Sequence, residues 1–285
     1  MKTRLKLFVS LAFTLCAIVL SAGELKIKDG ETLAFLGDSI TRNGWNNPYG
    51  YIRLIDAAFK AKGLNIKLIP SGIGGHKSTD MNKRMERDII KKNPNWMTLS
   101  CGVNDVWHGK TGVPLEQYKI EVKSMLNKAE KAGIKVMILT PTMIVEDPYT
   151  AHNKKLTEYV AFLLETAKKR NLLIADLNAD MHHLLNEAWA QVPKPKGMIL
   201  TCDGVHMAAR GDEMMARGIL KQFGMTDAEI NKIKAEVWSK IPSQPVNNIW
   251  FTESEYAALT AEAGKADLSV NDYIKKKILE ILPKK

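Results

Sequence analysis

Several features that would assign this chain to particular classes of protein are missing from its sequence. There is no low-complexity tract and no repeat of fixed period, so neither a disordered chain nor a solenoid is expected. There is no HExxH segment and no pair of CxxC segments, the patterns that would predict a zinc site. The apolar run at residues 7–20 is shorter than the roughly 20 residues that a membrane-spanning helix needs. With 45% hydrophobic and 25% charged residues, the chain has the composition of an ordinary globular protein.

The N-terminus has the three parts of a secretory signal peptide. Lys2, Arg4 and Lys6 precede the apolar run, and small residues follow it at 21–23. A basic start, a short apolar centre and a small-residue end predict that residues 1–22 are removed on export. We therefore expect a periplasmic or secreted protein. The alternative is an uncleaved membrane anchor, which the short apolar run disfavours.

Charge and cysteine content add two further expectations. The net charge is +10, but the basic residues are scattered over the predicted helices and the C-terminus and do not form one basic stripe. No nucleic-acid partner is therefore expected. Of the three cysteines, Cys16 lies in the predicted signal peptide, which leaves Cys101 and Cys202 in the mature chain. Export makes a disulfide between them chemically feasible, and two separate buried thiols are an equal alternative.

Short apolar segments alternate with amphipathic segments over most of the chain. The expected strands are residues 31–37, 65–69, 96–100, 134–139 and 172–175. The expected helices are residues 48–63, 78–91, 114–133, 151–170, 178–191 and 208–223. This alternation predicts an α/β fold with a parallel five-stranded sheet and helices on both faces. Ligands bind beyond the carboxyl ends of the strands in such sheets.

The composition changes after Gly224, where prolines and asparagines predict a linker. An extended segment at 248–252 and two helical patterns at 253–263 and 269–282 follow it, and this order weakly resembles a ribbon-helix-helix unit. DNA binding does not suit an exported protein, so we expect an appendage for packing or for homodimer formation. The predicted division is a signal peptide at 1–22, a main domain at 23–225, and a linker with a helical appendage at 226–285.

Four short blocks lie just after strands or in a C-terminal loop. They are Gly37-Asp38-Ser39-Ile40, Ile73-Gly74-Gly75, Gly102-Val103-Asn104-Asp105 and Asp203-Gly204-Val205-His206. A serine after a strand exposes its hydroxyl, glycines expose backbone N–H groups, and an asparagine amide can donate to an oxyanion. An aspartate three residues before a histidine can hold the imidazole in one tautomer. Each block alone also has an ordinary role, such as a helix cap, a turn or a phosphate-binding loop.

Together and in this order, the four blocks resemble the SGNH hydrolases, also called GDSL esterases and lipases, from about Leu33 to Met207. The resemblance implies a flavodoxin-like three-layer α/β/α sandwich and no metal or organic cofactor. It also implies roles for five residues. Ser39 matches the nucleophile, His206 the general base and Asp203 the residue that orients this base. The backbone N–H of Ser39, the N–H of Gly75 and the side chain of Asn104 match the oxyanion hole.

Two departures from the family pattern are small. Ile40 replaces the leucine of the motif that names the family, which should alter only packing. Gly74 stands beside Gly75 and is an alternative donor to the oxyanion hole.

The expected substrate is less closely defined by the sequence. The candidate pocket residues are Asp38, Trp45, Tyr49, His76, Trp107 and His108. Aromatic side chains with polar neighbours suit stacking on sugar rings, and ordinary packing is the alternative. No extended apolar lid is evident, which with export favours a short acyl group, acetate above all, on a carbohydrate. The alternatives are a lipase or thioesterase for longer acyl chains, and a non-catalytic carbohydrate-binding protein on the same scaffold.

Overall fold

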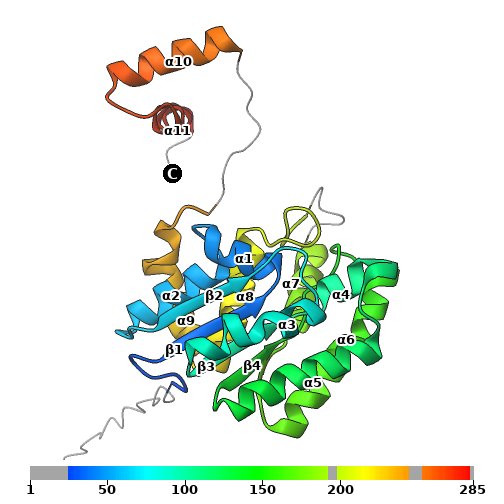
Figure 1. The fold of residues 1–285 in the computed structure, drawn as a ribbon. Helices are drawn as coiled ribbons and strands as arrows, with labels where there is room; N and C mark the ends of the chain where they lie inside the picture. Colours follow the sequence, from blue (N-terminus) through cyan, green and yellow to red (C-terminus); the bar gives the residue numbers. More distant parts are fainter. Residues whose placement is uncertain (1–24, 192–197, 244–251, 283–285) are drawn as a thin grey trace, which may run out of the picture. The chain divides into compact units, whose positions relative to one another are not determined.

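The computed structural model describes residues 25–191, 198–243 and 252–282 (Figure 1). The chain divides into two compact units, residues 1–243 and 244–285. The predicted signal peptide and the predicted extended segment, except for Thr252, lie outside the described residues. None of the described helices combines the length and apolar character that a membrane span requires.

Five parallel strands form the centre of the first unit, in the order β2-β1-β3-β4-β5. They are β1 (Thr32–Gly37), β2 (Lys67–Gly72), β3 (Trp96–Ser100), β4 (Lys135–Leu139) and β5 (Leu173–Ala175). β1, β3 and β4 are buried over almost their whole length, as parallel strands covered on both faces should be. The predicted five-stranded parallel sheet is therefore confirmed.

Helices cover both faces of this sheet (Figure 1). One face carries α3 (Ser78–Asp88), α5 (Leu115–Lys131) and α6 (Ala151–Arg170). The other carries α2 (Tyr51–Ala61), α7 (Leu177–Gln191) and α8 (Ala209–Gln222). The three-layer α/β/α sandwich expected from the sequence is thus the observed architecture.

Two short helices that the sequence analysis did not foresee start directly after central strands. α1 (Ser39–Asn46) follows β1, and α4 (Val103–Trp107) follows β3. The first helix was expected only from residue 48. The difference matters for the site, because it places Ser39 at the N-terminus of a helix.

The compact unit continues past residue 225, where the sequence analysis placed the end of the main domain. α9 (Asp227–Glu236) packs against α2 and α8, and a 3-10 turn (Trp238–Lys240) follows it. The Trp238 side chain is fully buried, and its indole Nε1 donates to the carbonyl of Leu54 at 3.0 Å. A buried tryptophan of this kind contributes apolar area that ties the segment to the sheet domain.

Over residues 252–282, the described part of the second unit, the chain forms the helices α10 (Glu253–Lys265) and α11 (Val270–Ile281). Thr252 caps α10 in a capping box with Glu255, and Ser269 caps α11 by accepting from the backbone N–H of Asp272. Both helices therefore begin at signals that the sequence carries locally.

Candidate active site

The topology of the sheet brings three of the four sequence blocks together. The chain passes from β1 to β2 on one side, whereas β3 lies on the other side of β1. A crevice at the carboxyl ends of the strands is expected where the strand order reverses in this way. A cavity of about 440 Å³ occurs there. It is lined by Ser39, Arg42, Gly74, Gly75, Asn104, Trp107, His108 and His206.

The turn between β1 and α1 fixes the position of Ser39. The Asp38 carboxylate accepts the backbone N–H of Ile40 at 2.8 Å and so caps α1, which makes Ser39 the first helical residue. A side chain at Gly37 would collide with Thr41, so only glycine allows the strand to turn into the helix here. The N-terminus of a helix favours negative charge, which is the charge an attacking alkoxide carries.

His206 joins Ser39 to Asp203 through its two ring nitrogens. The Ser39 hydroxyl lies 2.8 Å from Nε2 of His206, and Nδ1 of His206 lies 2.6 Å from the Asp203 carboxylate. Because an ionised carboxylate only accepts, Nδ1 carries the proton and Nε2 is free to accept from the serine hydroxyl. Burial would raise the pKa of Asp203, but hydrogen bonds from the His206 side chain and two backbone N–H groups hold this pKa below its ordinary value.

Hydrogen bonds to Glu146 hold the start of the loop that carries Asp203 and His206. Glu146 was not among the residues selected from the sequence. The Glu146 carboxylate accepts the backbone N–H groups of Ile199, Leu200 and Thr201 at 2.6–2.7 Å and the Thr201 hydroxyl at 2.7 Å. These bonds fix the start of the loop. No local pattern around Glu146 pointed to this contact, because its partners lie more than fifty residues away in the sequence.

Asn104 is held at both ends of its amide. Nδ2 donates to the carbonyl of His76 at 3.1 Å and lies 3.5 Å from the Asp38 carboxylate, whereas Oδ1 lies 3.3 Å from Nε2 of His108. The next residue, Asp105, accepts both the hydroxyl and the backbone N–H of Ser78, which anchors this block to the start of α3. The amide therefore has a fixed orientation at the edge of the cavity.

Asp38 is a buried carboxyl beneath the cavity. Its exposed fraction is 2%, and burial raises its pKa to about 6, with Asp105 adding repulsion. Its bond to the Ile40 N–H favours the ionised form and opposes this rise. Asp38 thus acts as the cap of α1 and not as a wall of the cavity.

The six candidate pocket residues divide into two groups. Trp107 and His108 line the cavity, and Trp107 is 39% exposed. The other four do not line it, and these are Asp38, Trp45, Tyr49 and His76. The ring of Trp45 is instead in cation–π contact with Arg53, whose guanidinium carbon lies 3.6 Å from the ring centroid. Tyr49 is buried in the hydrophobic core.

Arg42 lines the cavity although the sequence analysis did not select it. It lies three residues after Ser39 on α1, a spacing that places both side chains on the same face of the helix. Because no helix was expected at these residues, the spacing between Ser39 and Arg42 could not be used to predict that Arg42 lies beside Ser39.

Cys101 and Cys202 are both free thiols. Cys101 is buried and Cys202 is exposed. The thiols are thus separate and form no disulfide, and of the two that were expected to be buried in this alternative only Cys101 is. Burial raises the pKa of Cys101 well above its ordinary value, so this thiol stays protonated.

Comparison with known proteins identifies the family of this chain. The family model of GDSL-like lipases and acylhydrolases matches residues 35–214, a stretch that contains all four sequence blocks. The chain belongs to this family. The chain is a carboxylic ester hydrolase of the GDSL type, as its family and its similarity to acetylxylan esterases indicate.

Relatives of this GDSL esterase include acetylxylan esterases. The acetylxylan esterase of Geobacillus stearothermophilus is 26% identical over 219 residues, which cover 70% of this chain and 97% of the relative. A crystal structure of the acetyl xylan esterase AlAXEase is 32% identical with a TM-score of 0.62 and covers 67% of this chain and 98% of its own. A crystal structure of the Geobacillus enzyme Axe2 is 25% identical with a TM-score of 0.63, covering 71% and 98%. Crystal structures described as catalytic mutants of Axe2 replace a serine, an aspartate or a histidine by alanine.

Proposed function

We propose that this esterase is exported and hydrolyses short-chain acyl esters, acetyl esters above all, on carbohydrate by a Ser39–His206–Asp203 mechanism. The observation that carries the proposal is the continuous contact from the Ser39 hydroxyl to His206 Nε2 at 2.8 Å and from His206 Nδ1 to Asp203 at 2.6 Å. These are the three residue types that the catalytic mutants of Axe2 replace.

In the first half of the reaction, Nε2 of His206 takes the proton of the Ser39 hydroxyl while the serine oxygen attacks the acyl carbon. A tetrahedral intermediate forms, and its oxyanion is stabilised by the backbone N–H of Ser39, the N–H of Gly75 and the Asn104 amide. The carbon–oxygen bond to the leaving alcohol then breaks, and the proton on Nε2 passes to that alcohol. Ser39 is left as the acyl ester.

Water completes the cycle by the same route. His206 takes a proton from a water molecule, whose oxygen attacks the acyl-serine carbonyl. The second tetrahedral intermediate collapses when the proton on Nε2 returns to the Ser39 oxygen, which releases the carboxylic acid. Asp203 keeps the proton on Nδ1 throughout and stabilises the positively charged imidazole.

The lining of the cavity supports a short acyl group on a polar substrate. Apart from the glycines and Trp107, its lining residues are Ser39, Arg42, Asn104, His108 and His206, all of them polar or charged. A long acyl chain would leave these groups without water or hydrogen-bond partners, at a cost in free energy. Trp107, which lines the cavity and is 39% exposed, supplies an aromatic side chain on which a sugar can stack.

Release of acetate from a panel of acetylated xylan, acetylated pectin fragments and acetyl-sialic acid tests this proposal. The mature protein should release acetate from at least one of them, and the Ser39→Ala variant from none. Equal rates for the two proteins would favour the non-catalytic binding alternative. Turnover of long-chain esters without acetate release would favour the lipase or thioesterase alternative.

We further propose that residues 1–22 direct export and that the second unit mediates association between copies of the chain. Leu279, Ile281 and Leu282 support the latter, since all three apolar side chains are more than half exposed. Replacing Leu279 and Ile281 by aspartate should shift the protein to a smaller species in sedimentation. An unchanged sedimentation coefficient would remove this part of the proposal.

A further inference from the structure

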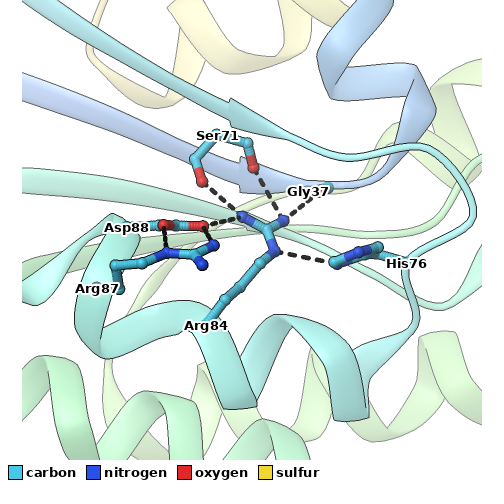
Figure 2. A network of polar contacts seen from close by, with 6 residues as sticks. All are labelled: Gly37, Ser71, His76, Arg84, Arg87 and Asp88. Atoms are coloured by element: carbon cyan, nitrogen blue, oxygen red, sulfur yellow. Dashed lines mark hydrogen bonds and ion pairs between the residues drawn. The ribbon is translucent and has the colours of Figure 1, made fainter.

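Arg84 on α3 is a buried arginine whose hydrogen-bonding capacity is completely used (Figure 2). Its exposed fraction is 6%. A guanidinium has five N–H groups, and each of them has an acceptor here. The acceptors are Nδ1 of His76, the hydroxyl and carbonyl oxygens of Ser71, the carbonyl of Gly37 and the carboxylate of Asp88.

Two of these partners are the ends of neighbouring strands. The carbonyl of Gly37, the last residue of β1, accepts from Arg84 at 2.7 Å. Ser71, near the end of β2, accepts from the same guanidinium at 2.6 Å through its hydroxyl and at 3.0 Å through its carbonyl. Because Asp38 and Ser39 follow Gly37 directly, Arg84 holds the strand end from which the serine projects.

A third partner connects Arg84 to Gly75 and Asn104, which line the cavity. Nε of Arg84 donates to Nδ1 of His76 at 3.1 Å, so this nitrogen carries no proton. Burial and the positive charge of Arg84 lower the pKa of His76, which keeps the ring neutral. The carbonyl of His76 in turn accepts from the Asn104 amide at 3.1 Å. The same guanidinium therefore reaches the residue next to Gly75 and, through its carbonyl, Asn104.

We propose that Arg84 is a positioning residue for ester hydrolysis, which sets the distance between the Ser39 nucleophile and the oxyanion donors Gly75 and Asn104. The inference rests on the proposed function of these three residues. Arg84 aligns the segment after β1, which carries Ser39, with the segment after β2, which carries Gly75. The relative position of these two segments decides how well the transition state is stabilised. A displacement of about 1 Å between reacting groups can lower a rate about 100-fold.

Arg87 provides a matched control on the same helix. It also binds Asp88, with Nε at 2.6 Å from the carboxylate, yet 73% of its side chain is exposed. Replacement of either arginine by lysine keeps the charge and the helix propensity. Only at Arg84 does the replacement remove a planar guanidinium whose five N–H groups bind the two strand ends, His76 and Asp88.

The test measures kcat and KM for an acetyl ester with wild type, Arg84→Lys and Arg87→Lys. Rates are expressed per active site titrated with a fluorophosphonate, so that unfolded molecules do not count. Arg84→Lys should lower kcat roughly 30- to 100-fold with KM changed by less than about threefold, because alignment affects the transition state more than substrate binding. Arg87→Lys should keep both constants.

A second measurement separates positioning from a general loss of stability. In an Asn104→Ala background, Arg84→Lys should cost several-fold less than in wild type, because one of the donors that Arg84 positions is already gone. Equal costs in both backgrounds, or a kcat per titrated site for Arg84→Lys within about threefold of wild type, would overturn the inference. A wild-type protein that turns over no acetyl ester would instead overturn the proposed function itself.

Discussion

Replacement of Asn104 by alanine is the most informative test of the oxyanion hole, because the structure allows its cost to be worked out. The amide lies at the edge of the cavity that contains Ser39, with its Nδ2 held by the carbonyl of His76. Loss of one such donor costs about 2.7–4 kcal/mol of transition-state stabilisation. The cavity is open to water at Trp107, which is 39% exposed, so screening favours the lower end of that range.

We therefore expect kcat of Asn104→Ala to fall about 100-fold. KM should change by less than about fivefold, since a neutral ester carbonyl gains only about 1 kcal/mol from the same donor. Asn178→Ala is the control, because its Nδ2 also donates to a backbone carbonyl, that of Pro141 at 3.0 Å, and the residue does not line the cavity. Both constants are measured with a chromogenic acetyl ester. A kcat for Asn104→Ala within about threefold of the control would refute the reasoning.

Three further predictions concern the loop that carries His206 and the buried carboxyl of Asp212. Asp203→Asn should lower kcat at least about 100-fold, since His206 loses the acceptor that fixes its tautomer; a rate above half of wild type would contradict this. Glu146→Gln should lower the free energy of unfolding by about 1–3 kcal/mol in urea, because the new amide opposes a backbone N–H; an unchanged midpoint would count against it. Burial raises the pKa of Asp212 to about 7, so the folded state keeps a proton that the unfolded chain releases, and stability falls as pH rises from about 4 to 7. The melting temperature of Asp212→Asn should therefore exceed that of wild type at about pH 8 and approach it near pH 4. A difference in melting temperature that does not change with pH would argue against this prediction.

Local signals in the sequence were sufficient for the order of the strands and of the six helices α2, α3, α5, α6, α7 and α8, but not for α1, α4 and α9 or for several boundaries. β2 was expected to end at Ile69, yet it continues to Gly72 through Pro70. Proline is tolerated there because β2 is an edge strand that pairs only with β1. α1 contains Gly44, a residue of low helix propensity, and the ring of Tyr51 packs where a side chain at this position would be. Contacts between elements, not local propensity, decided both cases.

The candidate site could be predicted to the extent that its residues belong to short motifs. Ser39 and His206 were selected on that basis, and the fold brings them into contact. Arg84 and Glu146 belong to no such motif, since their partners are strand ends and backbone N–H groups of distant segments. Trp45 was selected for being aromatic and near Ser39 in the sequence, but it packs under Arg53 instead. Because α1 was not predicted, the directions in which its side chains point could not be predicted either.

The central claim is that the Ser39 hydroxyl attacks the ester carbonyl and that His206 activates it. Its most direct test is to treat the protein with a fluorophosphonate, which phosphonylates an activated serine, and to map the adduct by peptide mass spectrometry. The account predicts one adduct, on Ser39, that forms rapidly in wild type and is almost absent in His206→Ala. Modification of a different serine, or ester hydrolysis that continues in full while Ser39 carries the adduct, would contradict it.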